Sequence, residues 1–168
     1  EPSKSGLKKH GILPEKTGWD ERRINKNIDA VILGMHARED NPELIASRNK
    51  GLKIYSFPEF LYEQSKNKKR IVIAGSHGKT TVTSMVMKVL KDNNVKFDYM
   101  VGAKVDGFET MVGFYEDSEI AVFEGDEYLT SALDKRPKFL WYKPHATVIT
   151  GIAWDHANVF PSMKMYVE

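Results

Sequence analysis

No cysteine occurs among the 168 residues of this sequence. Its absence excludes disulfide bonds, thiolate metal sites and cysteine nucleophiles from the chain, and it is compatible with a reducing compartment. Long hydrophobic runs are missing as well: no apolar stretch approaches the roughly 18 residues of a membrane span, and no signal-peptide pattern is present. We therefore expect a cytoplasmic protein without a membrane span.

The sequence also lacks an excess of charge of one sign. Lysine and arginine (25) nearly balance aspartate and glutamate (23), which leaves a net charge of +2. This balance gives no electrostatic argument for binding nucleic acid or an anionic membrane. The one basic run, at residues 66–70, has no interleaved aromatic residues, so a solvated linker is favoured over a nucleic-acid patch. Any recognition of phosphate therefore has to be local.

The hydrophobic content of 41% is enough for a real core. In the first part of the chain, residues 29–34 and 52–55 have the pattern of buried strands. Between them Asn41, followed by Pro42, predicts the start of a helix, with asparagine as its N-cap. A strand-helix-strand unit is typical of a parallel α/β sheet. We place a domain boundary in the basic run, which divides the chain into residues 1–66 and 67–168.

The second part continues the α/β pattern. Residues 71–74 predict a strand, and residues 97–101, 120–123 and 146–150 predict three more. Apolar residues recur at helical spacing after the first of these strands, and we expect them to form one buried helix face: Val82, Met85, Val86, Val89 and Leu90. The predicted fold class is α/β, with parallel sheets and flanking helices. The chain starts at Glu1 without methionine and stops soon after a predicted helix start, so we interpret it as a fragment.

Between the strand at 71–74 and this helix lies a loop suited to phosphate. Such a loop needs small residues, converging backbone N–H groups, a helix N-terminus, a lysine and a hydroxyl for a metal ion. Gly75, Gly78, Lys79 and Thr80 supply these in the required strand-loop-helix context. The position of the general motif's first glycine is Ile73, so the loop is a shorter form. It predicts binding of ATP or GTP phosphates by Gly75, Ser76, His77, Gly78, Lys79, Thr80 and Thr81.

Acidic and histidine side chains follow two other predicted strands. Glu124 ends one strand and is followed by Asp126 and Glu127, a cluster that could also be a solvated turn. Asp155 and His156 follow the strand at 146–150. Because ligands bind at the carboxyl edge of parallel strands, we expect Glu124 and His156 to hold metal beside the loop.

These motifs resemble those of the Mur ligases, the ATP-dependent amide-forming enzymes of peptidoglycan synthesis. The loop is similar to their short glycine loop, Glu124 to their strand-end magnesium glutamate, and Asp155-His156 to their Asp-His pair. The resemblance implies ATP and Mg²⁺ as cofactors. It also implies catalytic roles for Lys79, Glu124 and His156, with Thr80 and Glu124 on one magnesium ion and His156 on a second.

Residues 29–43 resemble the end of the family's Rossmann-like UDP-sugar domain, and residues 67–168 the start of its P-loop ATPase domain. His36, Arg38 and Asn41 could then face the UDP-sugar, although a role as N-cap explains Asn41 equally well. Since the family has three domains and this chain resembles parts of two, we expect no turnover from the chain by itself.

Within the family, the likeness is to the branch that uses UDP-N-acetylmuramate, to which either L-alanine or L-alanyl-γ-D-glutamyl-meso-diaminopimelate is joined. The basic segment 134–139, with Arg136, resembles that of the ligase that takes the tripeptide, whose carboxylates suit cations. An ordinary exposed loop is the alternative.

Three other functions compete with this interpretation: a folate-type ligase, a P-loop regulatory module and a structural protein. The sequence does not indicate the oligomeric state.

Overall fold

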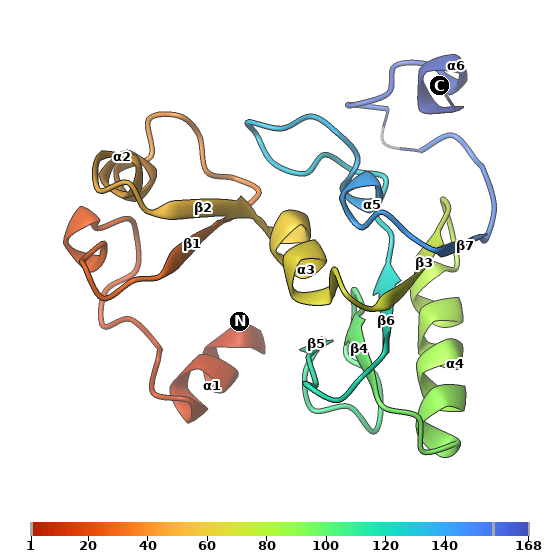
Figure 1. The fold of residues 1–168 in the computed structure, drawn as a ribbon. Helices are drawn as coiled ribbons and strands as arrows, with labels where there is room; N and C mark the ends of the chain where they lie inside the picture. The colour runs from red at the N-terminus through yellow and green to blue at the C-terminus, as the bar shows by residue number, and fades with distance from the viewer. Residues whose placement is uncertain (1, 156, 168) are drawn as a thin grey trace.

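The computed structural model describes residues 2–155 and 157–167, which form two α/β units (Figure 1). The elements of the first unit and the connecting helix are α1 (Pro2–Lys9), the 3-10 helix η1 (Glu21–Arg23), β1 (Ala30–Leu33), α2 (Pro42–Asn49), β2 (Lys53–Ser56) and α3 (Phe57–Ser65). The second unit contains β3 (Lys69–Ala74), α4 (Lys79–Asp92), β4 (Phe97–Met100), β5 (Val112–Gly113), β6 (Ile120–Glu124), α5 (Lys138–Trp141), β7 (Ala146–Ile149) and α6 (Met163–Val167). None of the helices in these ranges has the length and apolarity needed to cross a bilayer.

The first unit is the predicted strand-helix-strand. Strands β1 and β2 pair in parallel, with Ala30 opposite Lys53, and α2 connects them. The side chain of Asn41 caps α2 by accepting a 3.0 Å hydrogen bond from the Leu44 amide, and Pro42 occupies the first turn. Proline is tolerated there because that N–H has no partner within a helix.

The second unit is built on a five-stranded sheet with the order β5-β4-β6-β3-β7. All neighbouring strands pair in parallel except β5, which runs antiparallel to β4. The prediction of an α/β fold with a mostly parallel sheet is therefore confirmed. The carboxyl ends of β3, β6 and β7 lie at one edge of this sheet, and the loop before α4 lies at that same edge (Figure 1).

Helix α4 covers one face of this sheet with three of the five predicted residues. Thr83 and Met87 are fully buried, whereas Met85 and Val89 are each 61% exposed. Val82, Val86 and Leu90 do pack on the core, as predicted. The prediction was wrong for Met85 and Val89. The row Val82, Val86 and Leu90 can be flanked on its buried side by positions 85 and 89 or by positions 83 and 87, and in the structure Thr83 and Met87 are the buried ones.

The prediction of a solvated linker at 66–70 holds only in part: Lys66, Asn67 and Lys69 are exposed, but Lys68 and Arg70 are not. Arg70 is only 5% exposed, and its guanidinium donates 2.7 Å hydrogen bonds to the carbonyl oxygens of Ser65 at the end of α3 and Tyr142 just after α5. Lys68 forms a 2.8 Å ion pair with Asp98, whose side chain is fully buried. A bare count of charges could not anticipate this burial, because it depends on carbonyl groups that only the fold brings together.

Candidate functional site

Glycine is required at the first position of the loop after β3. Gly75 has φ +122°, and a Cβ built there would lie 2.6 Å from Thr150 Oγ1 and 2.8 Å from the Thr150 nitrogen. Gly78, with φ +80°, begins α4 as its N-cap, and no side chain caps the helix. The amide groups of the first helical turn therefore have no capping side chain, which is the arrangement that binds an anion.

Lys79 folds back over this loop. Its Nζ donates to the carbonyl oxygens of Gly75, at 2.6 Å, and Ser76, at 3.4 Å. It also forms a 2.8 Å ion pair with Glu127, in which the two side chains are 14% and 10% exposed. The ammonium is thus held at the loop itself, where it could bind phosphate oxygens.

Thr80 and Glu124 are brought together as predicted. The Thr80 hydroxyl donates a 3.0 Å hydrogen bond to Glu124 Oε1, and Glu124 Oε2 accepts one of 2.8 Å from the Gly102 amide. Gly102 allows this close approach, because a Cβ there would lie 2.8 Å from Glu124 Oε1. Within 2–155 and 157–167 there is no group of three or more His, Asp or Glu side chains that could hold a metal ion. Two hard oxygen donors still fit Mg²⁺, which takes one or two carboxylates and completes its shell with water and phosphate.

The connection after β7 closes one side of the loop. Ser76 donates to the Ala153 carbonyl at 2.6 Å, and its oxygen lies 2.7 Å from the Tyr166 hydroxyl. Thr150 donates to the His77 carbonyl at 2.5 Å. The His77 and Thr81 side chains are exposed. Ser76 therefore anchors the loop to the segment that follows β7. Its place in the sequence did not indicate this role.

The predicted second metal ligand, His156, lies outside the described residues, so its role stays a prediction. The segment that leads to it is placed against the loop: the Ser76 amide donates a 3.0 Å hydrogen bond to the Gly151 carbonyl. Asp155 lies at the end of the same segment and is half-buried.

The predicted substrate residues do not form one cluster. His36 and Arg38 are exposed in the loop after β1, and the Oδ1 atom of Asn41 is used by the helix cap. Arg136 pairs with Asp134 at 2.8 Å and lies over the Trp141 ring, 4.3 Å from its centroid. Substrate contacts by these four residues stay predictions.

The segment that contains Arg136 does reach the first unit. The Ala132 amide donates a 3.1 Å hydrogen bond to the Met35 carbonyl, next to His36 in sequence. The segment is closed on itself, since the Thr130 amide and hydroxyl both donate to the Arg136 carbonyl, at 2.9 and 2.7 Å. The segment that contains Arg136 is therefore held by hydrogen bonds within itself and to the first unit.

Residues 73–168, more than half of the chain, match the Mur ligase middle domain. The chain belongs to the Mur ligase family. It is 31% identical over 166 residues to the UDP-N-acetylmuramate–L-alanyl-gamma-D-glutamyl-meso-2,6-diaminoheptandioate ligase of Haemophilus influenzae, a match that covers 97% of this chain and 36% of the relative. It is 32% identical over 158 residues to the UDP-N-acetylmuramate–L-alanine ligase of Clostridium acetobutylicum, covering 94% and 32%.

A solved structure supports the same assignment. The crystal structure of a UDP-N-acetylmuramate:L-alanyl-gamma-D-glutamyl-meso-diaminopimelate ligase from Neisseria meningitides is similar to this chain with a TM-score of 0.83 and 28% identity, over 98% of this chain and 54% of that one. The chain spans about a third of the length of the curated relatives described above.

Glu127 is the residue of this Mur ligase site that sequence reasoning undervalued. It is 8% exposed and ion-paired, so the solvated-turn alternative is wrong for it. Its neighbour Asp126 pairs with Lys138 at 2.6 Å. Burial acts to raise the pKa of Asp126, but the Lys138 ammonium and the Tyr128 amide outweigh it, and the pKa lies below its ordinary value. The only signal in the sequence was the closeness of Glu127 to Glu124.

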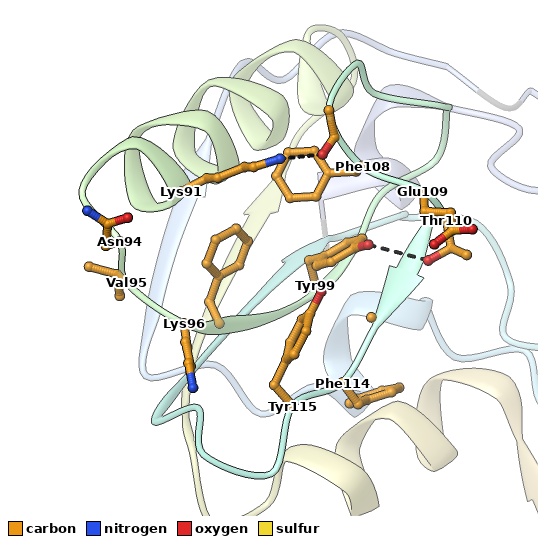
Figure 2. A pocket seen from close by; sticks show the side chains of 13 residues that line it. Lys91, Asn94, Val95, Lys96, Tyr99, Phe108, Glu109, Thr110, Phe114 and Tyr115 are labelled. Atoms are coloured by element: carbon orange, nitrogen blue, oxygen red, sulfur yellow. Dashed lines mark hydrogen bonds between the residues drawn. The ribbon is translucent and has the colours of Figure 1, made fainter.

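A cavity of this Mur ligase chain lies away from the site. It has a volume of about 670 Å³ and lies between the end of α4 and the β4–β5 connection (Figure 2). Tyr99, Phe108 and Tyr115 line it, and Tyr99 shares a 3.3 Å hydrogen bond with Thr110. No predicted site residue lines it, so we place the chemistry at the loop before α4.

Proposed function

We propose that this chain is part of an ATP-dependent ligase that activates the carboxylate of UDP-N-acetylmuramate and joins it to an amine. The observation that carries the proposal is the meeting of Lys79, Thr80 and Glu124 at the carboxyl edge of the sheet, in a chain that matches the Mur ligase middle domain. We take the setting to be the cytoplasm, as for the family.

In this proposal the loop binds the phosphates of ATP. The uncapped first turn of α4 faces the phosphate charge, and Lys79 binds the β- and γ-phosphates. Thr80 and Glu124 hold Mg²⁺, and His156 holds a second Mg²⁺. When bound, the metal supplies charge neutralisation, while the loop and helix align the γ-phosphate.

The reaction splits one difficult substitution into two easier ones. A carboxylate oxygen attacks the γ-phosphorus and ADP leaves, which gives an acyl phosphate. The amine nitrogen then attacks the carbonyl carbon, inorganic phosphate leaves, and the nitrogen loses a proton. Phosphate is a good leaving group where a carboxylate oxygen is a poor one, and the protein contributes mainly alignment and charge stabilisation.

We propose residues 1–66 as the end of the UDP-sugar-binding domain, with His36, Arg38 and Asn41 toward the sugar nucleotide. The hydrogen bond from Ala132 to Met35 supports a substrate position between the two units. For the amine we propose the tripeptide, because the segment around Arg136 is basic and the Haemophilus relative is named for that substrate. L-Alanine is the second candidate, favoured by the Clostridium relative at similar identity.

Phosphate release from ATP by the full-length protein tests this proposal. UDP-N-acetylmuramate is supplied with either L-alanine or L-alanyl-γ-D-glutamyl-meso-diaminopimelate. Release with the tripeptide alone supports the proposal as stated, and release with L-alanine alone replaces the amine by the second candidate. ATP consumption that does not depend on UDP-N-acetylmuramate would contradict ligase chemistry and favour a regulatory nucleotide-binding module.

A further inference from the structure

The ammonium of Lys79 has no spare hydrogen-bond donor. A lysine carries three N–H donors, and Nζ has three acceptors: the Gly75 carbonyl at 2.6 Å, Glu127 Oε2 at 2.8 Å and the Ser76 carbonyl at 3.4 Å. A phosphate oxygen can displace the Ser76 carbonyl, whose contact is the longest, but to approach as closely as Glu127 does it has to share the ammonium with that carboxylate or displace it. Glu127 is the only anion of the three, so phosphate and Glu127 compete as anions for one cation.

The pair is shielded from water. The side chains of Lys79 and Glu127 are 14% and 10% exposed, whereas those of the surface pair Lys88–Asp92 are 63% and 54% exposed. Exposed pairs contribute little because water and salt screen them, and breaking a buried pair costs much more. Displacing Glu127 consequently weakens nucleotide binding by a measurable amount.

The backbone on both sides of Glu127 is fixed. The Gly125 amide donates a 2.7 Å hydrogen bond to the Ile73 carbonyl of β3, and a Cβ on Gly125 would lie 2.6 Å from Val72 Cγ1. On the other side, the Lys138 amide of α5 donates to the Tyr128 carbonyl at 3.1 Å. The backbone that carries the carboxylate therefore stays in place when Lys79 moves toward a phosphate.

We propose that Glu127 is a positioning residue that holds the Lys79 ammonium on the phosphate loop in the absence of nucleotide and lowers nucleotide affinity by competing for it. The nucleotide part of this inference rests on the proposed function; the ion pair itself does not. Asp126, one residue earlier in the same turn, pairs with Lys138 instead and provides the matched control.

The ion pair can be tested without nucleotide. The full-length protein is treated with acetic anhydride, and acetylation of Lys79 is followed by peptide mass spectrometry. Glu127→Gln should accelerate acetylation of Lys79 several-fold, because an amide holds the ammonium less tightly than a carboxylate does and lets it reach solvent more often. Asp126→Asn should change the rate much less, because the Asp126 carboxylate acts on Lys79 only at longer range. Equal rates in Glu127→Gln and the unmodified protein would overturn the claim that Glu127 holds Lys79.

The competition is tested by calorimetric titration with Mg·ATP in the absence of acceptor. Glu127→Gln should bind about tenfold more tightly, a change equal to about 1.4 kcal/mol, and Asp126→Asn should change the affinity much less. In a Lys79→Ala background the gain from Glu127→Gln should disappear. Circular dichroism confirms that each variant is folded.

The outcomes separate the two proposals. If the unmodified protein binds Mg·ATP and Glu127→Gln binds equally or less tightly, the inference about Glu127 is overturned and the proposed function stands. If the unmodified protein binds no Mg·ATP, the proposed function fails, and the acetylation rates still decide whether Glu127 holds Lys79.

Discussion

At the scale of single residues, a few positions of the short loop after β3 tolerate little substitution. Residue 75 has to be glycine because its φ is positive and Thr150 leaves no room for a Cβ. The ammonium of Lys79 is held by three acceptors. Sequence reasoning identified these residues because the order of strand, glycine, lysine and threonine is local. It could not assign Glu127 to Lys79, since 48 residues separate the two.

The first prediction concerns Lys79. Lys79→Ala should abolish ATP turnover by the full-length protein, because the cation for the β- and γ-phosphates is gone. The fold should persist, but the melting temperature should drop, since Glu127 is left as a buried carboxylate without this lysine. Turnover is measured as phosphate release and stability by thermal denaturation. Turnover like that of the unmodified protein would show that the loop has been misassigned.

At the scale of elements, α4 shows which part of the packing a sequence pattern can resolve. The spacing of apolar residues predicted the helix and three of its packed residues, but the buried face includes Thr83 and excludes Met85 and Val89. Similarly, local residues mark the start of α3: Pro58 lies in its first turn, and the side chain of the N-cap Ser56 accepts a hydrogen bond from the Glu59 amide. The link that Arg70 makes between the end of α3 and the residues after α5 could not be expected from the sequence, because Tyr142 lies 72 residues from Arg70.

Two methionines on α4 allow a matched comparison. Met87→Ala should lower the free energy of unfolding by about 2 to 5 kcal/mol, because a fully buried side chain is replaced by a cavity. Met85→Ala, on the exposed side of the same helix, should have little effect. Urea denaturation of both variants tests this, and a greater loss from Met85→Ala would contradict the packing described for α4.

Arg70 provides a second prediction at this scale. Arg70→Met keeps an unbranched apolar stem but leaves the Ser65 and Tyr142 carbonyls without this donor, so we expect a loss of about 3 kcal/mol or more in unfolding free energy. Arg22→Met removes an arginine whose side chain is 82% exposed and should leave the melting temperature unchanged. Similar melting temperatures for the two variants would argue against a structural role for Arg70.

At the scale of the whole molecule, the two units meet through the segment between β6 and α5. The Ala132–Met35 hydrogen bond joins the units, and the ion pair of Asp126 with Lys138 closes the base of the segment. The sequence predicted the two units and a basic segment between strands. It did not predict that this segment folds back on itself and contacts the first unit, because turn hydrogen bonds and buried threonine leave no periodic pattern.

The closed segment should make stability sensitive to acid. The folded-state pKa of Asp126 is below its ordinary value of 3.8. The stabilisation of the fold by the ionised Asp126 carboxylate is therefore fully present above pH 3.8, and it is lost as the pH falls through the lower, folded-state pKa. The urea midpoint of the unmodified protein should therefore fall more steeply than that of Asp126→Asn as the pH falls below about 4. Parallel curves for the two proteins would show that Asp126 does not contribute.

The place of β7 at the end of the sheet has a consequence for local unfolding. Within the described residues it pairs only with β3, and Val148 and Ile149 are 44% and 60% exposed. Local opening is easiest where few apolar contacts hold a strand, so amide hydrogens of β7 should exchange with solvent faster than those of β3. Because Thr150 and Gly151 hold the phosphate loop through hydrogen bonds, each opening of β7 in this chain loosens the loop. Bound nucleotide should slow exchange in β7 as well as in the loop.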